Sequence, residues 1–329
     1  MNVKAAILSE PKGMDFLQIR DVQDEPRREG QLKIKVKLAG LNPVDVNLMS
    51  GNIRYNIWPI PHIPGVELYG ELMDDGKKLH KGDRVIVFPR LFDGVCRYCL
   101  TGNEEVCENG GLFGVSTNGA YREFANVEEK YIFKVPDSIS DETAVSLPVG
   151  GLTAMHALNV AGASHGKRVL VYGASGNTGI FSVMISSLIG ADVHAVSRKP
   201  WIADFGARQV FEPGKIPSGY LYDVVVNPLG SLGFEESLDH LDKNGKFVTF
   251  GTLGGNRIEA DIGKIYTRQL GILGSTGGSR RELSDLLVLL AGYKKNIPVE
   301  KTFSLDQISD ALKSFQGRNN GRIIIKVGS

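Results

Sequence analysis

The chain has 329 residues, of which 42% are hydrophobic and 23% are charged, and its formal net charge is +1 at pH 7. This composition is typical of a folded globular protein and excludes an intrinsically disordered chain. The near-zero charge gives no overall field for nucleic acid or an anionic membrane, so we expect a small-molecule substrate that is recognised locally. The length favours two domains.

The first ten residues hold too short an apolar stretch for a secretory signal, and no later run approaches the roughly 18 apolar residues of a membrane span. We therefore expect a cytoplasmic protein with no membrane partner. All three cysteines fall between Cys96 and Cys107. An odd number of closely spaced cysteines favours a metal site in a reducing compartment over a disulfide framework.

Short strands separated by turn residues dominate residues 1–140. Leu32–Leu38 alternates apolar and basic residues, which is typical of a half-buried strand. Lys81–Phe88 predicts a tight turn followed by a strand, and Ala120–Ala125 and Tyr131–Val135 predict two more. This part of the chain is expected to form a β-barrel or sandwich.

From residue 141 onward the pattern changes to strands alternating with helices, for example the helical stretch Ile180–Leu188. Such alternation favours βαβ units and a parallel sheet. The expected strands are Arg168–Tyr172, Val193–Val196, Tyr222–Val226, Lys246–Phe250 and Leu270–Leu273.

The last part of the chain predicts two amphipathic helices and a closing strand. Arg281–Tyr293 and Leu305–Phe315 carry apolar residues at helical spacing, and Arg322–Val327 is a short apolar run typical of a strand. The chain therefore returns to a strand after the helical region.

A glycine-rich turn joins the strand Lys167–Tyr172 to an apolar helix. Glycine is needed where the backbone turns tightly and approaches a pyrophosphate, and the helix N-terminus offers free N–H groups there. Ala174 replaces the first glycine of the usual pattern, but the strand before and the helix after are in place. The alternative is an ordinary strand-to-helix turn. The residues predicted to bind the cofactor here are Ser175, Gly176, Asn177, Thr178 and Gly179.

The second strand of this unit ends in Ser197, Arg198 and Lys199 rather than in an acidic residue. A carboxylate at that position would bind a ribose 2′-hydroxyl and repel a 2′-phosphate, whereas a hydroxyl and two cations can bind the phosphate. The sequence therefore predicts NADP(H) as cofactor. The alternative is that the two cations lie on a solvated loop.

The chain resembles the medium-chain dehydrogenase/reductase superfamily, or zinc-type alcohol dehydrogenase-like proteins, over nearly its whole length. The resemblance implies an α/β protein in which a GroES-like β-barrel catalytic domain (residues 1–140 and 281–329) flanks a Rossmann domain with a doubly wound parallel sheet (residues 141–280). It also implies a homodimer or homotetramer. The matching segments are Gly40–Asp45, Pro64–Glu67, Lys81–Val85, the cysteine lobe, Asn118–Tyr121, Gly151–Ala154 and the nucleotide turn.

Zinc-containing members of that family hold a catalytic zinc through a cysteine, a histidine and a third ligand. The resemblance places Asn42, Val66 and Val149 at these three positions. Valine cannot bind a metal, and three protein ligands cannot be assembled from Asn42 alone. The sequence therefore predicts that catalytic zinc is absent.

The Asn-Pro-Val-Asp segment resembles the zinc-free quinone oxidoreductase and enone reductase branch, in which NADPH delivers hydride to a quinone or an activated C=C bond. Asn42, Asp45, Tyr55 and His62 are the candidate catalytic residues, as donors to the developing negative charge. Each could instead only stabilise a loop. Two further readings stay open: a carbonyl reductase or alcohol dehydrogenase that has lost its catalytic zinc, and a non-catalytic NADPH-binding sensor.

The cysteine lobe has the spacing of the family's structural zinc site. Cys96, Cys99 and Cys107 match the last three ligands, and Asp93 stands where the first cysteine would be. Three thiolates and a carboxylate can form a closed tetrahedral site for one structural zinc. The alternative is a loop with three reduced, metal-free cysteines.

The resemblance implies four further cofactor contacts. Thr153 is expected near the nicotinamide amide, and Asn227 and Thr252 follow two strands of the sheet, where α/β folds bind ligands at the carboxyl edge. Arg322 is expected to reach the pyrophosphate from the C-terminal segment.

Overall fold

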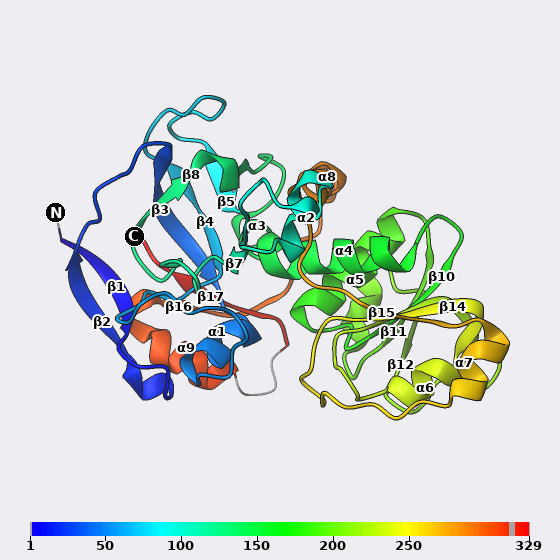
Figure 1. The fold of residues 1–329 in the computed structure, drawn as a ribbon. Helices are drawn as coiled ribbons and strands as arrows, with labels where there is room; N and C mark the ends of the chain where they lie inside the picture. The colour runs from blue at the N-terminus through cyan, green and yellow to red at the C-terminus, as the bar shows by residue number, and fades with distance from the viewer. Residues whose placement is uncertain (1, 316–319, 329) are drawn as a thin grey trace. The chain divides into compact units, whose positions relative to one another are not determined.

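The computed structural model describes residues 2–315 and 320–328, which form two compact units (Figure 1). Unit 1 consists of residues 1–149 and 279–329, and unit 2 consists of residues 150–278. The division expected from the sequence differs mainly in residues 141–149, which lie with unit 1. The reason is local packing, because helix α3 (Asp141–Val145) contacts strands β3 (Gln31–Gly40) and β4 (Glu67–Leu72).

Unit 1 is built on a sheet in which β3 is central. The strand order is β16-β17-β3-β4-β5-β9, and β8 also pairs with β3. Smaller two-stranded sheets are formed by β1 with β2 and by β6 with β7. The strands not yet bounded are β1 (Asn2–Leu8), β2 (Leu17–Gln23), β5 (Arg84–Val87), β6 (Arg90–Leu91), β7 (Gly111–Leu112), β8 (Phe124–Glu128), β9 (Ile132–Lys134), β16 (Val299–Ser304) and β17 (Arg322–Lys326).

Strand β3 confirms the alternation seen in its sequence. Leu32, Ile34 and Val36 are buried, while the lysines between them are half-buried. A strand points successive side chains to opposite faces, so every second residue reaches the core. Antiparallel pairing with both β17 and β4 brings the C-terminal segment beside Gly40, at the end of β3.

The strand expected at Ala120–Ala125 is displaced along the chain, and β8 begins at Phe124 instead. The cause is a set of backbone contacts outside the ladder. The amides of Ala120 and Tyr121 donate to the carbonyls of Gly65 and Pro64, and Arg122 forms an isolated bridge with Ala5. Residues 120–122 are therefore held against the Pro64–Gly65 segment and strand β1 rather than against β3.

Unit 1 also contains the two helices predicted near the C-terminus and several short ones. The predicted helix Arg281–Tyr293 is observed as α8, and the predicted helix Leu305–Phe315 begins with a 3-10 turn and continues as α9. The helices of this unit not yet bounded are α1 (Pro43–Met49), α2 (Arg97–Leu100), α8 (Arg280–Leu290) and α9 (Ile308–Phe315). Short 3-10 helices lie at Met14–Phe16, Glu104–Val106, Glu129–Tyr131 and Leu305–Gln307, with a π-helical turn at Leu147–Gly151.

Unit 2 is a six-stranded parallel sheet with the order β12-β11-β10-β13-β14-β15. The five strands predicted from the sequence are all present, with ends that differ by a few residues. Helices α4 and α5 pack on each other, and α6 contacts β14 (Figure 1). The elements are α4 (Leu152–Ala161), β10 (Arg168–Tyr172), α5 (Asn177–Leu188), β11 (Asp192–Val196), a 3-10 helix (Pro200–Phe205), β12 (Gln209–Phe211), β13 (Tyr222–Asn227), α6 (Phe234–Asp239), β14 (Leu241–Thr249), α7 (Ile262–Arg268) and β15 (Gly271–Gly274).

One face of this sheet carries an aromatic and aliphatic core. Leu170 and Tyr172 of β10 pack with Phe234 and Leu238 of α6, and the rings of Phe234 and Phe247 lie 5.1 Å apart, edge to face. Continuous apolar strands of this kind are typical of a parallel sheet buried on both faces. In the part of the chain that the structure describes, no helix is long and apolar enough to cross a membrane.

Candidate functional site

The turn between β10 and α5 has the backbone geometry expected of a pyrophosphate cradle. Gly173 adopts a positive φ of 57°, a conformation that glycine accepts readily. Gly179, on the first turn of α5, packs so closely that a Cβ there would lie 2.2 Å from the Gly173 carbonyl oxygen. Ala174 is fully buried, which explains why a small non-glycine residue is accepted at the first position of the pattern.

The helix that follows this turn offers its N-terminus at the carboxyl edge of the sheet. Gly176 caps α5 and is exposed, and Ser175, Asn177 and Thr178 are half-buried around it. The first N–H groups of a 12-residue helix and its positive dipole end favour an anion. The residues present therefore fit a dinucleotide pyrophosphate.

The serine and the two cations predicted to select the cofactor lie beside this cradle. Strands β10 and β11 are parallel with Tyr172 opposite Val196, so the glycine turn and Ser197 follow neighbouring strand ends. Ser197 is buried and its Oγ accepts a hydrogen bond from the Lys199 amide (3.0 Å), while Arg198 is exposed. A fixed hydroxyl and an exposed guanidinium thus follow the end of β11, next to the glycine turn after β10.

The other residues of unit 2 that are predicted to contact the cofactor differ in exposure and in their hydrogen bonds. Thr153 is half-buried on α4 and Thr252 is exposed after β14. Asn227 ends β13 and is fully buried; its Nδ2 donates to the Leu232 carbonyl (2.9 Å) and its Oδ1 accepts from the Leu229 amide (2.7 Å). The Asn227 amide is thus committed to shaping the loop after β13, and its predicted contact with the ribose stays a prediction.

The three positions that the resemblance assigns to catalytic-metal ligands, Asn42, Val66 and Val149, all lie in unit 1. Asn42 and Val66 are buried, and Val149 is half-buried. Two aliphatic side chains supply no ligand atom, so this donor set does not fit a zinc ion with three protein ligands.

A buried frame formed by Asp45, Glu67 and Arg322 surrounds these positions. The Asp45 carboxylate accepts from the amides of Asn42 (2.9 Å) and Val66 (3.2 Å). Glu67 accepts from the Val149 amide (3.1 Å) and pairs with Arg322. The backbone N–H of each of these three residues therefore donates to a buried carboxylate, and this contact does not depend on the side chain at that position.

Arg322 connects this frame to two more segments. Its guanidinium donates to the Leu41 carbonyl (3.0 Å), the Asn42 Oδ1 (3.3 Å) and the Ser146 Oγ (3.1 Å), in addition to Glu67. The side chain of Arg322 is 5% exposed and that of Glu67 is fully buried. The predicted reach of Arg322 to the pyrophosphate stays a prediction, because the structure commits this guanidinium to the interior of unit 1.

The sequence reasoning missed the roles of Glu67 and Ser146, because both face partners that are remote in the chain. One signal was available: Gly40 stands in a matching segment, and a Cβ there would lie 2.0 Å from the Glu67 carboxylate and 2.4 Å from the Arg322 guanidinium. Glycine is required at this position by close approach of a charged pair.

Asp45 is the most perturbed acid of the frame. Burial, which penalises the ionised form, raises the pKa of its carboxyl to about 7, and the charge of Glu67 adds to this effect, while the amides of Asn42 and Val66 oppose it. Burial also raises the pKa of the Tyr121 hydroxyl, which faces the same carboxyl. The protonated form is therefore more favoured in Asp45 than in a solvent-exposed carboxyl, because Asp45 is buried.

The two candidate donors from the following loop differ in availability. His62 is fully buried; its Nε2 lies 2.8 Å from the Gly114 carbonyl oxygen, and burial lowers the pKa of the imidazole, so it is neutral and fixed to the backbone. The Tyr55 hydroxyl accepts a hydrogen bond from Arg90, whose guanidinium also lies 5.4 Å from the Tyr55 ring centroid. Tyr55 keeps its own O–H proton for donation, whereas His62 is positioned as a structural residue.

The cysteine lobe brings the four predicted metal ligands together. Among residues 2–315 and 320–328, Asp93, Cys96, Cys99 and Cys107 are the group of His, Cys, Asp and Glu side chains that could hold an ion, and their ligand atoms all lie within 4.8 Å of one another. The Cys96 Sγ lies 3.5 Å from the Cys99 Sγ and 3.8 Å from the Cys107 Sγ. Zinc–thiolate bonds in a tetrahedron imply a sulfur separation of about 3.8 Å.

Asp93 is held ready to act as the fourth ligand. Its carboxylate accepts from the amides of Val95 (2.9 Å) and Cys96 (3.0 Å) and from the Asn109 Nδ2 (2.8 Å). The Cys96 and Val95 amides and then the Asn109 amide hold the pKa of Asp93 below its usual value, so the carboxylate is ionised. Three thiols and one fixed carboxylate at these separations fit a structural zinc.

Comparison with known proteins agrees with these two units. Residues 28–137 match the family described as the alcohol dehydrogenase GroES-like domain, and residues 178–292 match the family described as zinc-binding dehydrogenase. An NAD-dependent alcohol dehydrogenase of Sulfolobus acidocaldarius is 31% identical over 94% of this chain and 96% of its own length. An acryloyl-coenzyme A reductase of Metallosphaera sedula is 28% identical over 94% of this chain and 96% of its own length.

Solved structures show the same fold. A thermostable alcohol dehydrogenase from Pyrobaculum aerophilum superposes with a TM-score of 0.90 at 33% identity, covering 99% of this chain and all (100%) of that one. The similarity thus extends over both units and includes proteins whose names specify a metal-dependent family, an alcohol substrate or an unsaturated thioester.

Proposed function

We propose that this chain, which belongs to the medium-chain dehydrogenase/reductase superfamily, is an NADPH-dependent reductase of quinones, enones or other activated C=C bonds that works without catalytic zinc. The observation that carries the proposal is the donor set at positions 42, 66 and 149. The buried frame that positions these segments is intact, but two of the three side chains are valines. In an oxidoreductase family, an ordered frame without metal-ligating side chains favours substrates whose reduction does not require a metal ion.

The choice of acceptor follows from where negative charge develops. Reduction of a simple carbonyl concentrates charge on one oxygen, which zinc stabilises in metal-dependent enzymes. In a conjugated acceptor the charge is spread over several atoms, so neutral hydrogen-bond donors suffice. NADPH, when bound, supplies the hydride. The relatives named acryloyl-coenzyme A reductases, whose named substrate contains an activated C=C bond, support this class.

Asn42 and Tyr55 are the donors we assign to the acceptor's oxygen. The Asn42 Oδ1 accepts from Arg322, so the amide is oriented with Nδ2 as its donor group. The Tyr55 hydroxyl already accepts from Arg90, and its remaining proton is available to the substrate. The hydrogen bond from Arg90 also fixes the position of the Tyr55 hydroxyl.

The preference for NADPH over NADH rests on the end of β11. Ser197 and Lys199 are joined by a hydrogen bond, Arg198 is exposed beside them, and none of the three is acidic. A 2′-phosphate would gain charge-assisted hydrogen bonds there, whereas a 2′-hydroxyl would meet no carboxylate. The names of two relatives specify NAD, so cofactor preference is the point at which this chain is proposed to differ from them.

The second candidate function is a carbonyl reductase or alcohol dehydrogenase that has lost its catalytic zinc. The alcohol dehydrogenases among the relatives favour it. A non-catalytic NADPH-binding sensor is the third reading. All three share the nucleotide cradle and differ in what unit 1 does with the bound cofactor.

Anaerobic mixing with NADPH and a panel of acceptors separates the three functions. We expect NADPH oxidation with quinones and enones and none with simple aldehydes, and the Tyr55→Phe variant should lose turnover while NADPH binding is unchanged. Turnover of simple alcohols or saturated carbonyls without added metal would overturn the proposal in favour of the second candidate. Tight NADPH binding with every acceptor inert would identify a sensor.

A further inference from the structure

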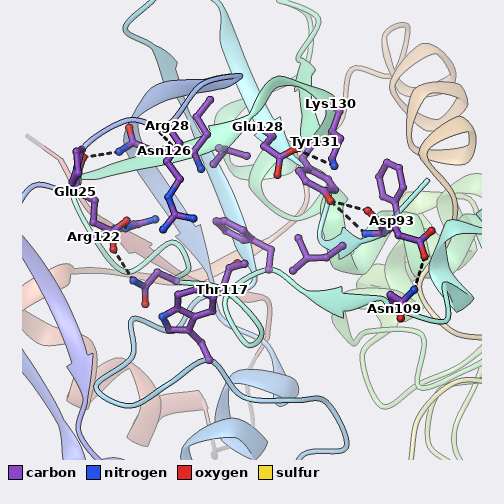
Figure 2. Close-up of a pocket in the computed structure, with 18 residues that line it drawn as sticks. Glu25, Arg28, Asp93, Asn109, Thr117, Arg122, Asn126, Glu128, Lys130 and Tyr131 are labelled. Carbon is purple, nitrogen blue, oxygen red and sulfur yellow. Dashed lines mark hydrogen bonds and ion pairs between the residues drawn. The ribbon is translucent and has the colours of Figure 1, made fainter. Parts of the chain in front are cut away.

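Unit 1 contains a cavity of about 550 Å³ that is separate from the buried frame (Figure 2). Charged, amide and aromatic side chains line it, and Asn42, Asp45, Glu67 and Arg322 are not among them. A volume of this size is within the range of small-molecule sites. Figure 2 shows Glu25, Arg122 and Asn126 gathered at one end and Asp93 with Asn109 at the other.

Arg122 is a buried cation with unused hydrogen-bond donors at this cavity. Its side chain is 6% exposed, and its guanidinium donates through Nη1 to Glu25 (3.0 Å). Its Nε–H is buried without an acceptor among the described residues. A guanidinium has five N–H donors, and burying them without acceptors is costly. Glu25 is the side-chain acceptor of this guanidinium among the described residues, so its remaining Nη donors could bind an acceptor on a ligand.

The same end of the cavity carries more positive than negative charge. Burial alone would raise the pKa of Glu25, but the charge and hydrogen bond of Arg122, the Asn118 amide and the charge of Arg28 hold it below its usual value. One carboxylate, about half exposed, thus faces two guanidinium groups. The surplus of one positive charge favours an anion.

The opposite end does not compete for that anion. Lys130 is paired with Glu128 (3.0 Å) and also lies over the rings of Phe92 and Tyr131. Asp93 is occupied by Asn109 and the amides of the cysteine lobe. At this end the charge of Lys130 is balanced by Glu128, and the carboxylate of Asp93 repels an anion. An anionic group is therefore directed toward Arg122.

The rest of the lining is suited to a flat apolar body. The aromatic residues Trp58, Phe92 and Phe113 line the cavity. Trp58 is 39% exposed although its backbone amide donates to the Val115 carbonyl (2.8 Å). An exposed tryptophan on a fixed backbone offers a large planar surface at low entropic cost.

We infer that this cavity is a binding site for a small organic monoanion with a planar apolar body, of the aryl carboxylate class, whose carboxylate bonds to Arg122 and whose ring packs on Trp58. A carboxylate matches the planar guanidinium and supplies the missing acceptors. The site lies within unit 1 and needs no cofactor, so it stands independently of the function proposed above.

Trp58 makes the inference directly measurable. The chain has two tryptophans, and the other, Trp201, lies in unit 2, so the Trp201→Phe variant reports on this cavity alone. In that background we expect benzoate to change the fluorescence saturably, with a dissociation constant below about 1 mM. Benzyl alcohol, which has the ring without the charge, and inorganic phosphate, which has the charge without the ring, should each bind at least about tenfold more weakly.

Two variants test the charge assignment with opposite signs. Arg122→Met should abolish the benzoate response, whereas Glu25→Gln, which removes the competing carboxylate, should tighten binding several-fold. Arg208→Met, an exposed arginine of unit 2, is the matched control and should change nothing. Equal binding of benzyl alcohol, weaker binding to Glu25→Gln, or no saturable response to benzoate in the folded Trp201→Phe protein would overturn the inference.

Discussion

The cysteine lobe and the buried frame of unit 1 show two different outcomes for a metal site. The lobe keeps three thiols and a fixed carboxylate, and their separations still fit zinc. The frame keeps Asp45, Glu67 and Arg322, but the side chains it would position for a metal are Asn42, Val66 and Val149. Metal-ligating side chains are present in the lobe, whereas two of the three proposed positions in the frame carry side chains that cannot bind a metal.

In the frame, the contacts that position the backbone are independent of the side chains at positions 42, 66 and 149. In the frame, backbone N–H groups bind the carboxylates, so the three segments stay in place whatever side chains they carry. In the lobe, the ligand side chains themselves close the loop, and losing them would leave little else to hold it. The following predictions test this difference, in order of decreasing effect.

Removing one thiol of the lobe should have the largest effect. We expect about one zinc per chain in the purified protein and none in Cys99→Ser, because a closed structural site needs four ligands and its metal contributes on the order of 10 kcal/mol to folding of the bound segment. Metal analysis after gel filtration measures this. Asp93→Cys is the control and should retain the zinc. Two zinc ions per chain would contradict the loss of the catalytic metal, and none would favour the metal-free lobe.

Breaking the frame should destabilise unit 1 without changing zinc content. Arg322→Met leaves the Glu67 carboxylate buried without its cation, which typically costs about 3–5 kcal/mol. Urea unfolding of the single variant and of the double variant Arg322→Met/Glu67→Met measures it, and the double variant should recover most of the loss. A single variant within about 0.5 kcal/mol of the parent protein would show that the frame is not a structural element.

Asp45 should make stability depend on pH in a defined direction. Its pKa is 3.8 in the unfolded chain and about 7 in the folded protein. Between these values the folded state keeps a proton that the unfolded state has lost, so the contribution of Asp45 to stability declines as pH rises from about 4 to 7, by at most about 4 kcal/mol. Unfolding at pH 5 and pH 8 should show this decline in the parent protein and a smaller one in Asp45→Asn. An equal pH dependence in both proteins would contradict the buried acid.

The smallest effect is expected in unit 2, away from both metal positions. Arg198→Asp should weaken NADPH binding by about 1–3 kcal/mol and leave NADH binding unchanged or improved, because the new carboxylate repels a 2′-phosphate and accepts from a 2′-hydroxyl. Fluorescence titration with each cofactor measures the ratio. Arg208→Asp, at the opposite edge of the same sheet, should leave it unaltered. Equal loss of both cofactors would remove the basis for NADPH preference.

The fold was predictable wherever local pattern determines it. The alternation in β3, the strand-and-helix rhythm after residue 141 and the glycine turn before α5 all depend on neighbours in the sequence. The strand at Ala120–Ala125 was misplaced because its start is held by Gly65 and Pro64, which no local pattern reveals. The β1–β2 hairpin at the N-terminus was not predicted at all.

The sequence was enough to predict the two valines among the three proposed metal positions and the clustered ligands of the cysteine lobe. It was not enough to predict the buried charged residues of the frame. Glu67 and Arg322 are 255 residues apart in the chain, and each alone has the composition of a surface residue. Likewise the commitment of Asn227 to its own turn depends on the loop after β13. Pairing between charges that are distant in the sequence can be seen only in the tertiary structure. The glycine at position 40, which leaves room for the Glu67–Arg322 pair, was the one local sign of it.

The most direct test of metal-free reduction of a conjugated bond is the fate of the transferred hydrogen. Cyclohexenone and NADPH deuterated at C4 are incubated with the protein, and the product is examined by NMR. We expect cyclohexanone with deuterium at the β-carbon, formed at the same rate with and without a zinc chelator that leaves the cysteine lobe loaded. Deuterium at the carbinol carbon of cyclohexenol would show carbonyl reduction and contradict the account.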